Sequence, residues 1–162
     1  MPNPHPARKP NRLPEFDYSQ PGSYFVTTVI LHRQNILGQI VDGQMILSES
    51  GQIVQKTWND LPIHYPGICL DGFVVMPNHV HGLITIIDSK YPLTEIIRAF
   101  KSFSARAINQ ARGGQGQPVW QRSFYDHIIR DEHELQKILD YIETNPARWD
   151  EDQENILPTS SS

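Results

Sequence analysis

Short runs dense in β-branched and aromatic residues alternate along the chain with longer segments that carry apolar residues at helical spacing. The first kind of run predicts strands over residues 23–31, 69–75, 79–87 and 123–129. The second kind predicts helices from Ser48 or Ser50 to Leu61, from Leu93 to Ala111, and from Asp131 to Asn145. The dipeptide Asp42-Gly43 predicts a small β-hairpin over residues 38–47. The order of elements is therefore strand, hairpin, helix, strand, strand, helix, strand, helix.

This order is typical of an α+β, ferredoxin-like (split βαβ) domain, with a four-stranded antiparallel sheet and two helices on one face. The third helix is additional, and because it begins beside the last strand it can lie against the sheet. We expect the domain to cover residues 23–149. A Pro-rich N-terminal arm (1–22), extended or in part disordered, precedes it, and a flexible acidic tail (150–162) follows it.

Composition places the chain among single-domain globular proteins. It has 162 residues, of which 38% are hydrophobic and 20% charged, which is enough for a sizeable core. The single cysteine, Cys69, excludes an internal disulfide and a Cys-rich zinc site, and we interpret it as a buried thiol. No apolar run reaches membrane-spanning length and the first residues lack a signal-peptide core, so we expect a cytoplasmic protein without a membrane partner. The sequence leaves monomer or homodimer open.

The formal net charge of -4 argues mildly against a nucleic-acid partner, but the charge is unevenly distributed. Between residues 96 and 125 there are five basic residues and no Asp or Glu, whereas acidic residues cluster near the C-terminus. A basic stretch of this kind suits a phosphate backbone with unstacked bases. The candidate DNA contacts are Arg98, Lys101, Arg106, Trp120, Arg122 and Arg130. The alternatives are a solvated helix face for the basic residues and core packing for Trp120.

The chemistry-bearing stretch is His79-Val80-His81, at the start of the third predicted strand. Residues two apart in a strand point to the same face, so the two imidazoles would meet while Val80 turns into the core. Two neutral imidazoles on a rigid strand form half of a metal site. The alternative is a pair of hydrogen-bonded histidines on a half-exposed strand.

The last helix carries a second pair, Tyr141 and Asn145, four residues apart and therefore on one helix face. A phenol beside a metal is a candidate nucleophile, although its ordinary pKa of about 10 makes it a poor one without help. The Asn145 amide oxygen is a candidate third ligand, and Asp126 and His127 are candidates for orienting a ligating imidazole. Alternatively, Tyr141 lies at the edge of the core and Asn145 ends the helix before Pro146.

Three stretches, VVMPNHVHGLI (74–84), VWQRSFYDHIIR (119–130) and ILDYIETNPARW (138–149), resemble the IS200-like single-tyrosine HUH transposases, and specifically their REP-associated tyrosine transposase branch. The resemblance implies that His79, His81 and Asn145 bind Mg²⁺ or Mn²⁺. It also implies that Tyr141 attacks single-stranded or hairpin DNA, giving a 5′-phosphotyrosine and a free 3′-OH. The family fold is the ferredoxin-like sheet predicted above. Members of this branch tend to be more basic than this chain.

Three other functions stay open at this point. A metal-dependent nuclease that uses water would not need Tyr141. A domesticated DNA-binding module would bind hairpin DNA without forming a covalent adduct. A metal site for small-molecule chemistry would show no salt-dependent affinity for single strands.

Overall fold

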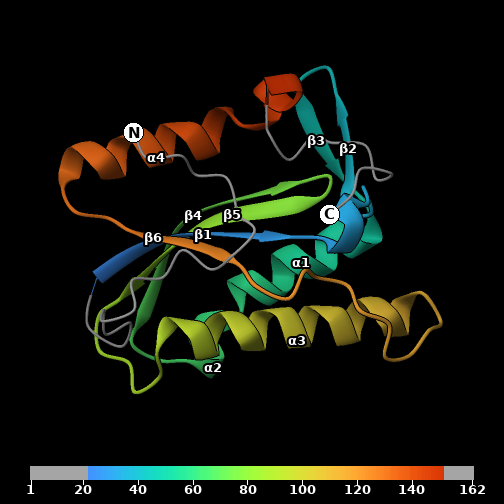
Figure 1. Ribbon diagram of the computed structural model, residues 1–162, viewed down its shortest axis with the longest axis horizontal. Coiled ribbons are helices and arrows are strands. Elements are labelled where there is room, and N and C mark those ends of the chain that lie inside the picture. The colour runs from blue at the N-terminus through green and yellow to red at the C-terminus, as the bar shows by residue number, and fades with distance from the viewer. Residues whose placement is uncertain (1–21, 152–162) are drawn as a thin grey trace.

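The computed structural model describes residues 22–151 (Figure 1). The predicted N-terminal arm and acidic tail therefore lie outside the described residues, apart from their inner ends. Gly22, which the sequence assigned to the arm, is the first residue of a strand, and residues 150–151 belong to a short 3-10 helix.

Four strands form the main sheet, in the order β4-β5-β1-β6, and every neighbouring pair is antiparallel. They are β1 (Gly22–Val29), β4 (Ile68–Met76), β5 (His79–Ile86) and β6 (Tyr125–Ile128). The excursion around Asp42-Gly43 is a separate hairpin of β2 (Gly38–Val41) and β3 (Gln44–Leu47). With the first and third sheet strands in the centre, the predicted ferredoxin-like α+β fold is confirmed.

The helices lie in two layers, one on each face of the sheet (Figure 1). One layer holds α1 (Glu49–Asn59), the short α2 (Leu61–His64) and α3 (Leu93–Ala111). The other holds α4 (Glu132–Thr144), which continues into the 3-10 helix η2 (Pro146–Glu151). A further 3-10 turn, η1 (Leu31–Arg33), follows β1. None of the helices within residues 22–151 is long and apolar enough to cross a bilayer.

Each layer has its own core. The larger cluster, under α1 and α3, includes Trp58, which is 1% exposed and stacks on Phe73 with ring centroids 4.6 Å apart. A Cβ added at Gly82 would lie 2.4 Å from the Trp58 ring, so only glycine lets α1 approach β5 here. The smaller cluster, under α4, contains Phe25, Leu83, Ile138 and Ile142. The sheet is therefore buried on both faces.

Local signals in the sequence explain where the helices begin. The Ser48 hydroxyl accepts a hydrogen bond from the Gly51 amide at 3.1 Å, and the Asp131 carboxylate accepts one from the Glu134 amide at 2.8 Å. Both caps were predicted. The first helix was predicted to run to Leu61, with Pro62 ending it, but α1 ends at Asn59 and Pro62 lies in the first turn of α2, where its missing N–H costs nothing.

The prediction that Cys69 is buried is also wrong, because its side chain is exposed. Cys69 lies on β4, which is an edge strand of the sheet. Its neighbour Ile68 is buried in the larger core cluster, and successive side chains of a strand point to opposite faces. Cys69 therefore points away from that core.

Candidate active site on the α4 face of the sheet

The pleat of β5 turns His79 and His81 toward the α4 face. Val80, between them, packs in the core under α1 and α3, whereas Leu83 packs in the core under α4. Both histidines are fully buried, with 0% exposure, and their Nε2 atoms are 3.1 Å apart. The predicted meeting of the two imidazoles is therefore seen, but at a buried position instead of a half-exposed one.

Each imidazole is held through its other nitrogen. His79 Nδ1–H donates to Asn78 Oδ1 at 2.7 Å, which leaves the Nε2 lone pair of His79 facing His81. His81 Nδ1 lies 2.7 Å from the Thr27 hydroxyl, on the directly opposite residue of β1. The Asn78 amide in turn donates to the Arg33 carbonyl oxygen at 3.4 Å. Asn78 and Thr27 thus fix the orientation of the histidine pair.

These two orienting residues were hard to predict from the sequence. Asn78 is next to His79 in the Pro-Asn turn, so its position could have suggested a role, but Thr27 is 54 residues away from its partner. Only the strand register brings Thr27 opposite His81. Phe25, also on β1, stacks against the His81 ring with centroids 5.3 Å apart and an interplanar angle of 21°.

The last helix brings Tyr141 to the histidines. Its hydroxyl lies 3.4 Å from His81 Nε2, and its ring meets the His81 ring edge-on with centroids 5.2 Å apart. Phe25 packs edge-on against the same tyrosine at 6.2 Å. The predicted approach of the last helix to the histidines is therefore observed.

Asn145 follows one turn after Tyr141 and is only 4% exposed. Its Oδ1 atom is buried and has no hydrogen-bond partner among the described residues. Four residues further on, the Trp149 ring lies nearly parallel to the His79 ring, with centroids 6.3 Å apart and an interplanar angle of 20°. In the sequence, Asn145 thus lies between Tyr141, which contacts His81, and Trp149, which contacts His79. A buried, unpaired carbonyl oxygen calls for a partner, and a bound ion is one partner that could satisfy it.

The donor set fits a divalent cation. Two nitrogens bound in neighbouring positions of an octahedral ion at about 2.1 Å are about 3.0 Å apart, close to the separation of the two Nε2 atoms. Within residues 22–151 no group of three or more His, Cys, Asp or Glu side chains is arranged to bind a metal. A metal here would therefore be bound by two imidazoles and an amide oxygen, with water or substrate completing its coordination.

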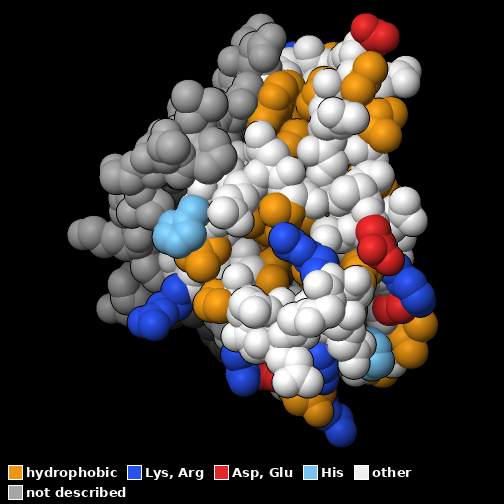
Figure 2. Space-filling view, turned by 90° about the vertical axis from the view of Figure 1, so that its right-hand side faces the viewer, with side chains coloured by type: hydrophobic (Ala, Val, Ile, Leu, Met, Phe, Trp, Pro, Cys, Tyr) orange, Lys and Arg blue, Asp and Glu red, His pale blue; other side chains and the backbone are white. Residues whose placement is uncertain are grey.

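Most of the candidate DNA contacts gather on the other side of the sheet. Arg98, Lys101 and Arg122 line a hollow of about 480 Å³ between α3 and the segment that leads into β6. Lys101 Nζ donates to the Arg122 carbonyl oxygen at 2.9 Å, and Arg98 forms an ion pair with Glu95. Figure 2 shows Lys and Arg side chains in the lower part of the molecule, where α3 lies in Figure 1.

Arg106 is exposed on α3, and the exposed residues Arg122 and Arg130 flank the edge strand β6. The cationic surface and the histidine pair thus lie on opposite faces of the sheet. A strand of DNA that touched both the cationic surface and the histidine pair would have to cross an edge of the sheet. The basic residues at both ends of β6 favour the edge that β6 forms.

Trp120 packs in the core, which is the alternative that the sequence left open, although it also lines the hollow beside Arg98 and Lys101. It is 7% exposed, packs against Phe100 with ring centroids 5.6 Å apart, and donates from Nε1 to the Ser104 hydroxyl at 3.0 Å. The backbone of Trp120 bridges to Ile30, and this pairing turns the indole under α3.

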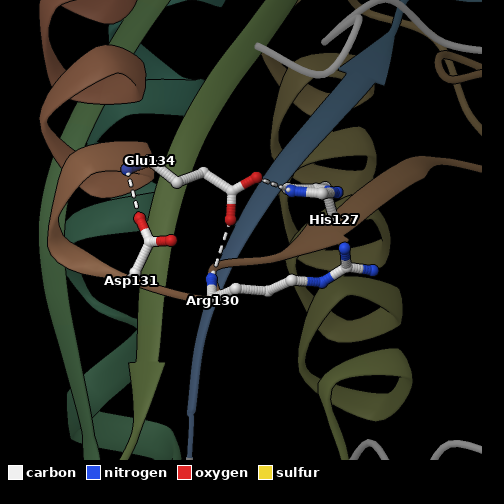
Figure 3. Close-up of polar contacts among 4 residues, drawn as sticks. All are labelled: His127, Arg130, Asp131 and Glu134. Carbon is white, nitrogen blue, oxygen red and sulfur yellow. Dashed lines mark hydrogen bonds and ion pairs between the residues drawn. The ribbon is translucent and has the colours of Figure 1, made fainter.

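Asp126 and His127 do not orient the metal-site imidazoles, contrary to the prediction. His127 Nε2 lies 2.6 Å from Glu134 Oε2, and Glu134 Oε1 accepts from the Arg130 amide at 2.7 Å (Figure 3). Asp126 lies opposite Val26, whose side chain faces the α1–α3 core, and paired residues of neighbouring strands share a face. Asp126 therefore points away from the histidines.

The Glu134 carboxylate links the first turn of α4 to β6. Burial by itself raises the pKa of Glu134, but the hydrogen bonds from the Arg130 amide and from His127 outweigh burial, so the pKa lies below its usual range. Tyr125, the other tyrosine on this face, has a raised phenol pKa, because it is buried and because Asp126 and Glu134 carry negative charge nearby.

Known proteins similar to this chain identify its family. The model of the family "Transposase IS200 like" matches residues 39–145. An uncharacterised protein of Haemophilus influenzae is 33% identical over 90% of this chain and 92% of its own length. A second protein of that species, named "Putative REP-associated tyrosine transposase", is 27% identical over 82% of this chain and 74% of its own length.

The fold is also found among solved structures. A REP-associated tyrosine transposase bound to a REP hairpin superposes with a TM-score of 0.62, at 21% identity, over 85% of this chain and 72% of the other. Because the family model covers well over half of the chain, and the relatives and the fold agree with it, the chain belongs to the IS200-like transposase family.

Proposed function

We propose that the protein nicks single-stranded DNA and transfers the cut strand, with Tyr141 as the nucleophile and a divalent metal on His79, His81 and Asn145. The observation that carries the proposal is the position of the Tyr141 hydroxyl, 3.4 Å from an imidazole nitrogen that is itself 3.1 Å from its counterpart on His79. The unpaired Asn145 Oδ1 supplies the oxygen donor that such a site needs.

The metal is Mg²⁺ or Mn²⁺ in this proposal, as the resemblance of the motifs to the family implies. When bound, it would withdraw charge from the phosphate and favour in-line attack. The chain's own contribution is rigidity, because Asn78 and Thr27 hold both rings with their Nε2 atoms directed at one point. Imidazole ligands that are fixed in this way lose little freedom when the ion binds.

The reaction is a transesterification with balanced atoms. The Tyr141 oxygen forms a bond to phosphorus as the bond from phosphorus to the 3′-oxygen breaks. The phenol loses its proton and the leaving 3′-oxygen gains one, so the products are a 5′-phosphotyrosine and a free 3′-OH. The new bond keeps the energy of the phosphodiester, and attack by another 3′-OH rejoins the strand without ATP.

The substrate in this proposal is single-stranded or hairpin DNA. One similar protein of known structure was solved with a REP hairpin. In this chain, Arg98, Lys101, Arg106 and Arg122 on the α3 side, with Arg130 beyond β6, are the basic residues proposed to contact the phosphate backbone.

The test is transfer of label to the protein. The protein is incubated with 5′- or 3′-labelled single-stranded DNA and Mn²⁺, denatured, and separated on a gel. Label attached on the 3′ side of the cut should remain on the protein, and the adduct should vanish in Tyr141→Phe. Tyr125→Phe is the matched control and should still form the adduct. A nuclease that uses water would cut DNA equally well in Tyr141→Phe, and a domesticated binding protein would give no adduct in any form.

A further inference from the structure

A second hollow lies beside the candidate active site, between η2 and the β2–β3 hairpin, with a volume of about 600 Å³. Trp149 forms part of its wall, and Pro77, from the turn that precedes the histidines, forms another part. The η2 helix is close to the hairpin, since a Cβ added at Gly43 would lie 3.7 Å from the Ala147 Cα. None of the metal-site residues lines this hollow.

The chemistry of the wall favours an uncharged ligand over a phosphate. No described residue that lines the hollow carries a charge. Ile40 and Leu47 contribute apolar surface, while the side-chain amides of Asn35 and Gln39 contribute donors and acceptors. A flat, uncharged group with polar edges matches this wall, and in a strand of DNA that group is the nucleobase.

Trp149 connects the hollow with the histidines. Its ring is nearly parallel to that of His79, 6.3 Å away, and it also lines the hollow. A base in the hollow would therefore lie beside the histidine pair. Indole faces are good stacking surfaces, and stacking on an aromatic side chain tolerates every base.

We propose that this hollow binds one nucleobase of the DNA strand, stacked on Trp149, and so positions the adjoining phosphate at the histidine pair. That this strand is the substrate of the protein rests on the function proposed above. The binding of a base does not depend on cleavage, so the two proposals can fail separately.

The tryptophans of the chain make the proposal measurable. Trp58 is 1% and Trp120 is 7% exposed, whereas Trp149 lines this hollow. Trp120 borders the cationic hollow beside α3, so the quenching that is lost in Trp149→Phe is the part that reports on this site. The probes are a thymidine 12-mer and an abasic 12-mer with the same phosphates. Both are titrated in chelator, so that no strand is cut. We expect the thymidine strand to quench tryptophan emission and to bind about five- to a hundredfold more tightly than the abasic strand.

Two pairs of variants localise the effect. Trp149→Phe should lose the quenching but keep the preference for bases, because phenylalanine retains a stacking face, whereas Trp149→Ala should lose both. Ile46, which lines the hollow and is 49% exposed, is replaced in Ile46→Glu, and Ile63→Glu adds the same charge at a site that is 74% exposed on α2. Only Ile46→Glu should weaken binding of the thymidine strand relative to the abasic strand.

Equal affinity for both strands in the wild type, or an unchanged preference in Trp149→Ala and Ile46→Glu, would overturn the proposal. Quenching that appears only after removal of residues 152–162 would also overturn it, because the chain's own C-terminal segment would then occupy the hollow. If the base preference is present but no adduct forms with Mn²⁺, the base site stands and strand transfer fails. If the adduct forms without a base preference, strand transfer stands and the base site fails.

Discussion

The Thr27 hydroxyl offers a sharp test of how the protein prepares its metal site. Thr27→Val removes the hydroxyl while keeping the size and β-branching of the side chain, so the central strand β1 should still form. His81 Nδ1 would then lose its partner at 2.7 Å in a fully buried position. Without that partner the ring is free to tilt, and its Nε2 atom would no longer be held 3.1 Å from that of His79.

The expected size of the effect follows from the role of Thr27. Loss of a partner that orients a metal-binding imidazole typically lowers metal affinity or activity by about 10- to 100-fold. The Mn²⁺ concentration that gives half-maximal covalent adduct should therefore rise by that factor in Thr27→Val. Affinity for single-stranded DNA in chelator should stay the same, because the hydroxyl is buried and does not meet the strand.

Thr27→Ser is the matched control, since it keeps the hydroxyl and removes only a methyl group. It should retain a half-maximal Mn²⁺ concentration close to that of the wild type, at the cost of some thermal stability. If Thr27→Val has the wild-type Mn²⁺ dependence, or if Thr27→Ser is impaired as much as Thr27→Val, then the hydrogen bond to His81 does not prepare the site.

Three further predictions address the metal, the DNA and the attachment of α4. His79→Ala and His81→Ala should each abolish the adduct, and chelator should do the same to the wild type until Mg²⁺ or Mn²⁺ is restored; full activity in chelator would remove the metal from the mechanism. Replacing Arg98, Lys101 and Arg106 together should flatten the salt dependence of DNA affinity, measured by anisotropy, because fewer counterions are released. An unchanged slope would mean that these three residues do not contact the DNA backbone, and the basic residues of the N-terminal arm, Arg8, Lys9 and Arg12, would be tested next. Glu134→Gln should lower thermal stability near neutral pH. Because the folded pKa of Glu134 is depressed, its contribution is present above the unfolded pKa and is lost as pH falls through the folded pKa, so the difference from wild type should disappear in acid. A difference that persists at low pH would contradict the role of the carboxylate.

The elements that the sequence predicted well are those with a strong local pattern. The structure of α3 runs from Leu93 to Ala111, as the apolar stripe predicted, and Asp131 caps α4 because a carboxylate at that position can accept the Glu134 amide. The shared face of His79 and His81 also follows from local geometry alone. None of these features requires knowledge of which strands pair.

Features that depend on long-range strand pairing could not be predicted from the sequence. The contact of Thr27 with His81 exists only because β1 and β5 pair in one particular register. Trp120 lies in a stretch that is basic and follows a Gly-rich loop, so local composition indicated a surface, but pairing with Ile30 buries it. The sequence predicted that His127 orients a ligating imidazole, but His127 is paired with Glu134 of the next element, α4.

The two candidate nucleophiles, Tyr125 and Tyr141, lie in different layers of the fold. Tyr125 lies on β6, within the sheet that holds the histidines, and its phenol pKa is raised by burial and by the charges of Asp126 and Glu134, which makes the phenolate harder to form. Tyr141 lies on α4, a separate layer that touches the sheet through a small apolar cluster and the Glu134 carboxylate. A nucleophile must approach phosphorus from the side opposite the leaving oxygen, and later withdraw to let a 3′-OH return. A side chain on a helix that packs over the histidine pair can do both through a small shift of the helix. The position of Tyr141, on the layer above His81 and not beside it in the sheet, therefore favours Tyr141 over Tyr125 as the nucleophile of the proposed reaction.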